Sequence, residues 1–81
     1  MSLPWYDVST IKHRVEKIRN KAIAIRKLVS LVSEAVSSAD YRVAILYIDM
    51  IEEHLKDIQK YCGDMRTILI KNGVTSDEGK N

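Results

Sequence analysis

The chain has 81 residues, of which 46% are hydrophobic and 30% charged, and its formal net charge is +2. This composition excludes a disordered chain, which combines lower hydrophobicity with higher net charge. One Cys excludes an intramolecular disulfide framework and a Cys-based zinc site, and three Gly with one Pro argue against a turn-rich β fold. We therefore expect a small all-α protein.

The N-terminal segment, residues 1–6, contains the aromatic pair Trp5 and Tyr6. It lacks the charged and apolar regions of a signal peptide, and the chain has no run of about 18 apolar residues, so we expect a cytoplasmic protein that does not span a membrane. We expect Trp5 and Tyr6 to cap the open end of a helical bundle, because an ordered Trp usually buries most of its ring. The alternative is an exposed pair that docks on a partner.

The first expected helix covers about residues 7–36. Its apolar residues recur with alternating spacings of three and four, which is the a/d heptad pattern of a coiled coil. Asp7 is a good N-cap for this helix, and a start at Pro4, one turn earlier, is the alternative. The a positions are Val8, Val15, Ala22, Val29 and Val36, and the d positions are Ile11, Ile18, Ile25, Val32 and Ala39.

The second expected helix covers about residues 38–72, after a turn at about residues 36–40. Its apolar series has the same spacing but a different phase, so one continuous helix would expose its apolar row to water. Ser37 as N-cap, with Asp40 three residues later, fits a capping box that follows a chain reversal. The second series consists of Tyr41, Ala44, Ile48, Ile51, Leu55, Ile58, Cys62, Met65 and Leu69.

The expected fold is an antiparallel helical hairpin, residues 7–73, followed by a flexible polar tail, residues 74–81. A hairpin this small buries little apolar surface alone, and near the turn the apolar residues extend beyond the a and d rows. We therefore expect a homodimer of hairpins that forms a four-helix bundle, with a different partner chain as the alternative. The expected dimer interface consists of Leu28, Leu31, Ala35, Val43, Leu46, Tyr47, Met50, His54, Tyr61 and Ile68.

Basic residues are concentrated in the first helix, where residues 12–27 contain seven Lys or Arg and only one acidic residue, Glu16. In one interpretation these side chains flank the helix contact and pair with carboxylates such as Glu53, Asp57 and Asp64. In the other they form an electropositive face for nucleic-acid phosphates or an acidic protein. The seven residues are Lys12, Arg14, Lys17, Arg19, Lys21, Arg26 and Lys27.

No residue pattern predicts a catalytic, cofactor or metal site. His54 precedes Asp57 by three residues, but the di-iron bundle pattern requires Glu three residues before His, and that position is Ile51. We expect His54 to be half-buried, to hydrogen bond across the bundle and to be mildly pH-sensitive. We expect Cys62 to be a small core hydrophobe, and we expect neither enzyme activity nor a cofactor.

In plan, this hairpin dimer resembles the Rop-type helical-hairpin dimers, and it is similar in size to small hairpin proteins encoded by plasmids and viruses. The Rop resemblance implies contact with RNA through one face of the bundle. Our prediction is a non-enzymatic adaptor or regulatory module that binds itself and another protein. The alternative is a Rop-like hairpin that binds the backbone of RNA or DNA through the basic face of its first helix.

Overall fold

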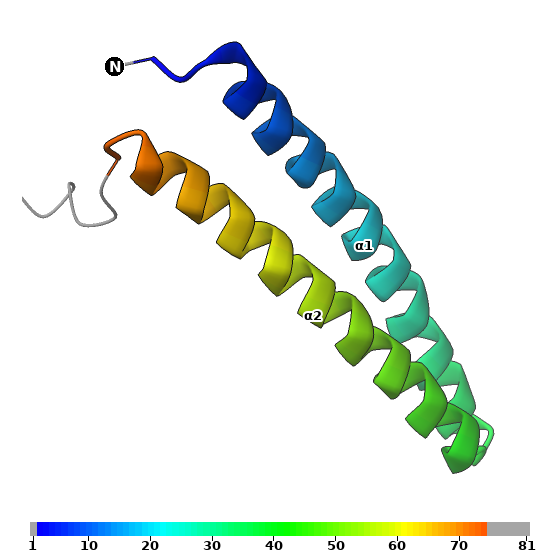
Figure 1. The fold of residues 1–81 in the computed structure, drawn as a ribbon. Coiled ribbons are helices and arrows are strands. Elements are labelled where there is room, and N and C mark those ends of the chain that lie inside the picture. The colour runs from blue at the N-terminus through cyan, green and yellow to red at the C-terminus, as the bar shows by residue number, and fades with distance from the viewer. Residues whose placement is uncertain (1, 75–81) are drawn as a thin grey trace, which may run out of the picture.

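The computed structural model describes residues 2–74, which form two α-helices joined by a short turn. Helix α1 spans Trp5–Ser37, and helix α2 spans Tyr41–Lys71. The helices run side by side in opposite directions, so the start of α1 and the end of α2 lie together at the end opposite the turn, which we call the open end (Figure 1). The all-α hairpin predicted from the two heptad series is confirmed. Of the expected polar tail, residues 75–81 lie outside the described residues.

Helix α1 begins two residues earlier than expected, and the prediction of Asp7 as its N-cap is wrong. Pro4 occupies the N-cap, and its carbonyl accepts hydrogen bonds from the backbone N–H groups of Asp7 (3.0 Å) and Val8 (3.1 Å). Proline suits this place because it lacks an N–H that the helix would leave unpaired. Asp7 therefore lies in the first turn, where the positive end of the helix dipole stabilises its negative charge.

The turn between the helices comprises only residues 38–40, and the prediction of Ser37 as an N-cap is wrong. Ser37 is the last residue of α1, and Asp40 is the N-cap of α2, without a side-chain capping hydrogen bond in the described residues. Ala39 has a φ of 57°, in the left-handed region, and the N–H of Asp40 donates to the carbonyl of Ala35 (2.8 Å). This Schellman closure reverses the chain directly at the end of α1.

The end of α2 shows the same closure. Asn72 is the C-cap, Gly73 has a φ of 92°, and the N–H of Val74 donates to the carbonyl of Leu69 (3.0 Å). Glycine carries no Cβ and adopts this left-handed conformation without the steric cost that Ala39 meets at the turn.

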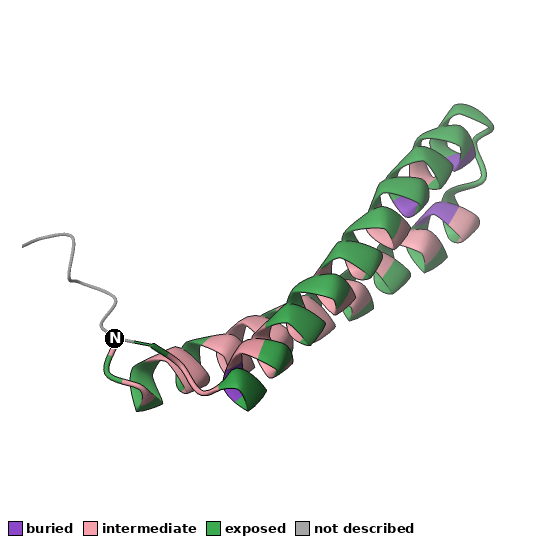
Figure 2. Ribbon diagram, turned by 90° about the horizontal axis from the view of Figure 1, so that it is seen from above, coloured by how far each residue is buried: buried purple, intermediate pink, exposed green. Residues whose placement is uncertain are grey.

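The helices contact each other through their d and g rows, which corrects the prediction of an a/d contact. Leu28 and Ala35 of the g row in α1, together with Ala44 of the d row in α2, are the buried hydrophobic residues of the described chain. Most of the remaining surface is exposed or only half-buried (Figure 2). The exposed members of the a rows are Val15, Ala22, Val29, Val36, Tyr41, Ile48 and Leu55.

The shift of the contact by one row has a physical reason. Spacings of three and four identify an apolar stripe, but a hairpin needs to bury only one side of that stripe. A contact centred between d and g buries Leu28 and Ala35 and also lets the long g-row side chains of Arg14 and Lys21 reach carboxylates on α2. The a rows are left on the outside.

Candidate interaction surface

The uncovered a rows of the two helices form one continuous strip. When two antiparallel helices face each other through the same heptad rows, equal positions lie on the same side of the pair. The a rows of α1 and α2 therefore share one side of the hairpin, which we call the apolar face. It carries no charged residue at any a position and consists of Val8, Val15, Ala22, Val29, Val36, Tyr41, Ile48, Leu55, Cys62 and Leu69.

Near the open end, the apolar face is hollowed into a groove of about 330 Å³ along the last turns of α2, which we call the α2 groove. Its one charged lining residue is Arg66, which lies in the e row at the outer edge of the helix. Cys62 is half-buried here, which places its thiol among apolar neighbours. The other lining residues are Met65, Leu69, Ile70 and Val74. Sequence reasoning missed this groove, because it assigned Val74 to the polar tail.

The opposite side of the hairpin, which we call the paired-charge face, carries the c and g rows. Arg14 Nε lies 3.0 Å from Asp64 Oδ2, and Lys21 Nζ lies 2.9 Å from Asp57 Oδ2. The guanidinium of Arg14 also lies 5.9 Å from the centroid of the Tyr61 ring. These half-exposed contacts join α1 to α2, so the half of this face near the open end is already engaged within the hairpin.

The Lys21–Asp57 pair changes the protonation behaviour of both groups. The hydrogen bond and charge of Asp57 raise the pKa of Lys21 above its ordinary value. The same hydrogen bond, with the Lys21 charge, lowers the pKa of Asp57. Both shifts favour the charged forms, because each group stabilises the ionised state of the other.

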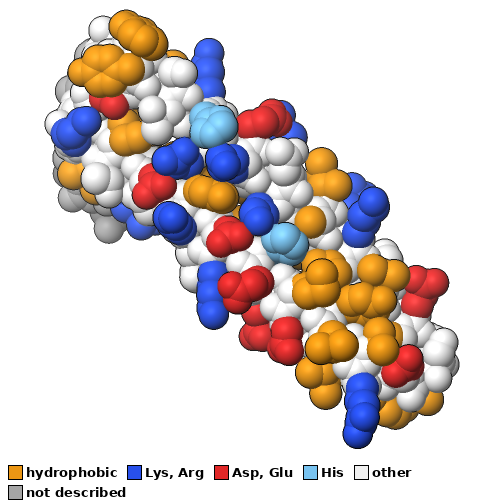
Figure 3. Space-filling model, turned by 45° about the vertical axis from the view of Figure 1, so that its right-hand side comes forward, with side chains coloured by type: hydrophobic (Ala, Val, Ile, Leu, Met, Phe, Trp, Pro, Cys, Tyr) orange, Lys and Arg blue, Asp and Glu red, His pale blue; other side chains and the backbone are white. Residues whose placement is uncertain are grey.

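The basic cluster of α1 is divided between the faces. Arg14 and Lys21 pair with α2, and the ammonium of Lys17 lies 5.9 Å from the centroid of the Tyr61 ring. Arg19 pairs with Glu16 within α1 at 3.0 Å. On the face seen in Figure 3, acidic and basic side chains are interspersed along the half towards the open end, and hydrophobic side chains gather near the turn. Lys12, Arg26 and Lys27 are exposed and have no ion-pair partner among residues 2–74.

At the open end, Asp7 closes the hairpin. Its side chain is buried, with 5% of the residue exposed, and its Oδ2 accepts a hydrogen bond from Asn72 Nδ2 at 3.1 Å. Lys71 Nζ lies 3.7 Å from the same oxygen. The carboxylate thus ties the first turn of α1 to the last turn of α2.

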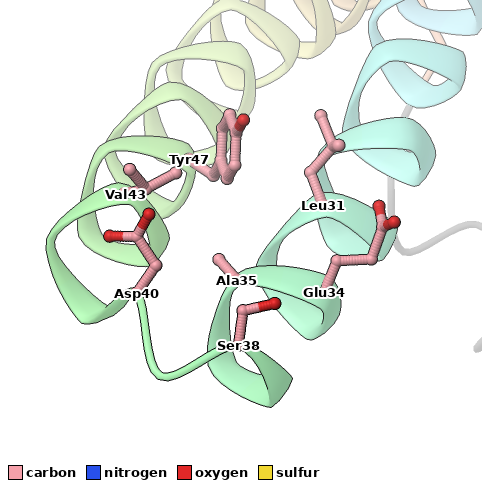
Figure 4. Close-up of a pocket in the computed structure, with 7 residues that line it drawn as sticks. All are labelled: Leu31, Glu34, Ala35, Ser38, Asp40, Val43 and Tyr47. Carbon is pink, nitrogen blue, oxygen red and sulfur yellow. The ribbon is translucent and has the colours of Figure 1, made fainter.

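At the turn, the paired-charge side has a hollow of about 210 Å³ between the two helices (Figure 4). Leu31 and Ala35 from α1 and Val43 and Tyr47 from α2 form its apolar walls, and Glu34, Ser38 and Asp40 lie at its rim. The hollow therefore combines apolar walls with a rim that carries two carboxylates.

His54 lines a second hollow of about 270 Å³ beside the Lys21–Asp57 pair. The residue is half-buried, as expected. The expected hydrogen bond across the bundle is not made through Nδ1, which is buried and has no partner in the described part of the chain. The sulfur-bearing side chain of Met50 and the carboxylate of Glu53 complete the lining.

The residues expected at the dimer interface differ in how far the hairpin buries them. Leu28 and Ala35 are already buried between α1 and α2 within one hairpin. The exposed members are Leu31, Leu46 and Met50. The half-buried members are Val43, Tyr47, His54, Tyr61 and Ile68.

Within one hairpin, Trp5 and Tyr6 leave the open end uncovered, and their capping of a bundle stays a prediction. They lie in the first turn of α1 with edge-to-face rings 5.9 Å apart, and Trp5 is 80% and Tyr6 55% exposed. Asp7, one residue later, takes the inward position instead.

Neither helix of the described residues is long and apolar enough to cross a membrane. Within residues 2–74, no group of three or more His, Cys, Asp or Glu side chains is placed to hold a metal ion. Comparison with protein-family models, curated proteins and solved structures finds no match to this chain.

Proposed function

We propose that this chain is a non-enzymatic interaction module in which two hairpins pair through their apolar faces to form a four-helix bundle. The bundle then serves as an adaptor or regulatory surface for another protein. The observation that carries the proposal is the charge-free a rows of both helices, which lie together on the uncovered side of the hairpin.

The size of the apolar face matches a stable dimer. The hairpin extends 54 × 28 × 14 Å, so it is a single layer of helices. A face of this length and about 20 Å in width, the width of two helices, offers on the order of 1,000 Å². Specific interfaces typically bury about 800 Å² per partner. A second layer of helices is also the usual way to cover an apolar helix stripe.

The two faces of the hairpin differ in what burial would cost. Burying the paired-charge face would take Arg14 and Lys21 with their carboxylates, and the ammonium of Lys17, out of water. Desolvating ion pairs is unfavourable unless the partner replaces the lost hydration. The apolar face has no such group at its a positions. Self-association through the apolar face is therefore favoured over association through the paired-charge face.

Nucleic-acid binding ranks second among the candidate functions. It is favoured by the exposure of Lys12, Arg26 and Lys27, which are free to contact phosphates. It is weakened by the engagement of Arg14 and Lys21 with carboxylates of α2, because a paired cation contributes less to the attraction of a phosphate.

Sedimentation at micromolar concentration tests the dimer with a matched pair of variants. Val29 lies in the a row and Ile23 in the b row of the same helix, and they are 54% and 55% exposed. Val29→Asp places a carboxylate in the proposed contact and should weaken association about a hundredfold or more. Ile23→Asp should leave it nearly unchanged, because the b row faces away from the second copy.

The expected species for the native chain has twice the 9.3 kDa mass of one chain. A native chain that sediments at 9.3 kDa would contradict the proposal. Equal weakening by the two variants would also contradict it, because the contact would then not follow the a row.

A further inference from the structure

We propose that the α2 groove is the binding site for the Trp5 indole of a second copy of the chain, so that the dimer has both turns at the same end. This inference rests on the proposed self-association and adds the arrangement of the two copies. The inference starts from two features at the open end of the hairpin, the apolar α2 groove and the 80% exposed side chain of Trp5.

The heptad position of Trp5 directs it toward a second copy. Trp5 lies in the e row of α1, the row next to the a row on the side away from α2. Its own hairpin therefore leaves it 80% exposed. In a face-to-face dimer, an e-row residue lies at the edge of the contact, opposite the e row of the helix above it.

Two arrangements bring the apolar faces of two identical hairpins together. A two-fold axis perpendicular to the helices stacks α1 on α1 of the second copy, with the turns at opposite ends. A two-fold axis parallel to the helices stacks α1 on α2 of the second copy, with the turns at the same end. Each arrangement makes all neighbouring helices antiparallel, so the helix dipoles do not distinguish them.

The charges of the e rows distinguish the arrangements. The e row of α1 carries Lys12, Arg19 and Arg26, so stacking α1 on its own copy would line up cations along one edge. The e row of α2 contains Ile45, Glu52, Gln59 and Arg66. Stacking α1 on α2 of the second copy therefore reduces the repulsion between like charges, which favours the parallel axis.

The register of the hairpin aligns Trp5 with the α2 groove. Arg14 lies level with Asp64 and Lys21 with Asp57, so each step forward on α1 corresponds to one step back on α2. In this register Arg26 lies level with Glu52, Arg19 with the neutral Gln59 and Lys12 with Arg66, so each edge has one oppositely charged and one like-charged pair. Trp5 lies level with Gly73, next to Val74. An axis parallel to the helices preserves these levels between the copies, which brings Arg26 opposite Glu52 of the second copy and Trp5 against the second copy's α2 groove.

The chemistry of the α2 groove suits an indole ring. Its walls are the apolar side chains of Met65, Leu69, Ile70 and Val74, and the volume is about 330 Å³. A thioether such as that of Met65 makes favourable contacts with aromatic rings. Arg66 at the edge offers a guanidinium, and Trp is the ring that binds such a cation best.

Trp5 is the single Trp of the chain, so its fluorescence reports on the α2 groove directly. When the concentration of the native protein is raised and monomers associate into dimers, the emission of Trp5 should shift to shorter wavelength because the indole leaves water. Trp5→Ala should weaken dimerisation at least tenfold. Tyr6→Ala is the matched control, since Tyr6 is an exposed neighbouring aromatic in the f row and should leave dimerisation within about twofold.

A distance between spin labels tests the arrangement of the copies without relying on Trp5. The label is attached through a ketone-bearing amino acid introduced at position 38 in the turn, so that Cys62 of the α2 groove stays native. Turns at the same end place the labels about two helix diameters apart, roughly 20–30 Å. Turns at opposite ends would separate them by nearly the full 54 Å length of the hairpin.

The outcomes separate this inference from the function on which it rests. A dimer with the short label distance and blue-shifted Trp5 emission supports both. A dimer with the long distance, or with Trp5 emission unchanged on association, overturns the inference and leaves the proposed self-association standing. A chain that stays monomeric overturns both.

Discussion

The two broad faces of the hairpin are built from the same two helices but differ in how their side chains are engaged. On the paired-charge face, Arg14 and Lys21 reach across to Asp64 and Asp57, and the contacts close within one chain. On the apolar face, seven of the ten a-row residues are exposed in the described part of the chain, and Val29 is 54% exposed. The comparison teaches that one face helps to complete the hairpin, and that the other is the face on which we propose that a second copy binds.

The helices contact each other through their d and g rows, which lie between the two faces. This contact gives two neighbouring residues of α1 very different exposures. Leu28 is 6% exposed, whereas Val29 is 54% exposed. Leu28→Ala should lower the free energy of unfolding by about 2–3 kcal/mol, because it removes a buried isobutyl group and leaves a cavity. Urea denaturation measures this change.

Val29→Ala is the control for that prediction. At concentrations where the native chain is monomeric, it should change the free energy of unfolding by less than about 0.5 kcal/mol, as for other exposed positions. Equal losses for Leu28→Ala and Val29→Ala at such concentrations would show that the distinction between the inner row and the apolar face is wrong.

A smaller effect is expected at the open end of the hairpin. Asp7→Ala removes the acceptor for Asn72 Nδ2 and a negative charge from the first turn of α1. We expect a loss of about 1 kcal/mol in the free energy of unfolding, the size of one hydrogen bond to a charged group partly offset by the better helix former.

Asp49→Ala provides the comparison for Asp7, because Asp49 is an exposed carboxylate in α2 with no hydrogen bond or ion pair among the described residues. Its free energy of unfolding should stay the same or rise slightly, since Ala has the higher helix propensity. If Asp7→Ala is no more harmful than Asp49→Ala, Asp7 does not close the open end.

The sequence predicts the hairpin but not the row that holds it together. Alternating spacings of three and four identify two apolar stripes, and the change of phase between them requires a reversal near residue 38. The g row of α1 contains Asp7, Arg14 and Lys21, and such charged residues are typical of positions that flank a contact. Their inward placement depends on partners at matching levels of α2, an amide donor for Asp7 and carboxylates for Arg14 and Lys21, which one-dimensional spacing does not reveal.

The candidate interaction surface was only partly predictable. An excess of apolar surface, and hence a need for a second layer, follows from the sequence. Its location does not, because moving the inner contact from the a and d rows to the d and g rows exchanges the covered and uncovered sides. The sequence signal that pointed to this shift was the apolar g row of α2, with Tyr47, Tyr61 and Ile68, which we had assigned to the dimer interface.

The smallest expected effect concerns the pH dependence of the paired-charge face. The pKa of Asp57 is lowered by its hydrogen bond with Lys21, so the pair stabilises the fold above about pH 4 and this contribution is lost as the pH falls through the lowered pKa. The pKa of Lys21 is raised by the same contact, so the contribution is present below about pH 10 and is lost as the pH rises through the raised pKa.

Lys21→Met keeps the aliphatic stem and removes the ammonium, so thermal denaturation should show a small deficit in stability relative to the native chain. That deficit should be constant between about pH 5 and pH 9 and should shrink as acidification protonates Asp57. Lys27→Met is the control, because Lys27 is exposed and has no ion-pair partner among residues 2–74. A deficit of Lys21→Met that persists unchanged after acidification has protonated Asp57 would mean that pairing with Asp57 does not account for the contribution of the Lys21 ammonium to the hairpin.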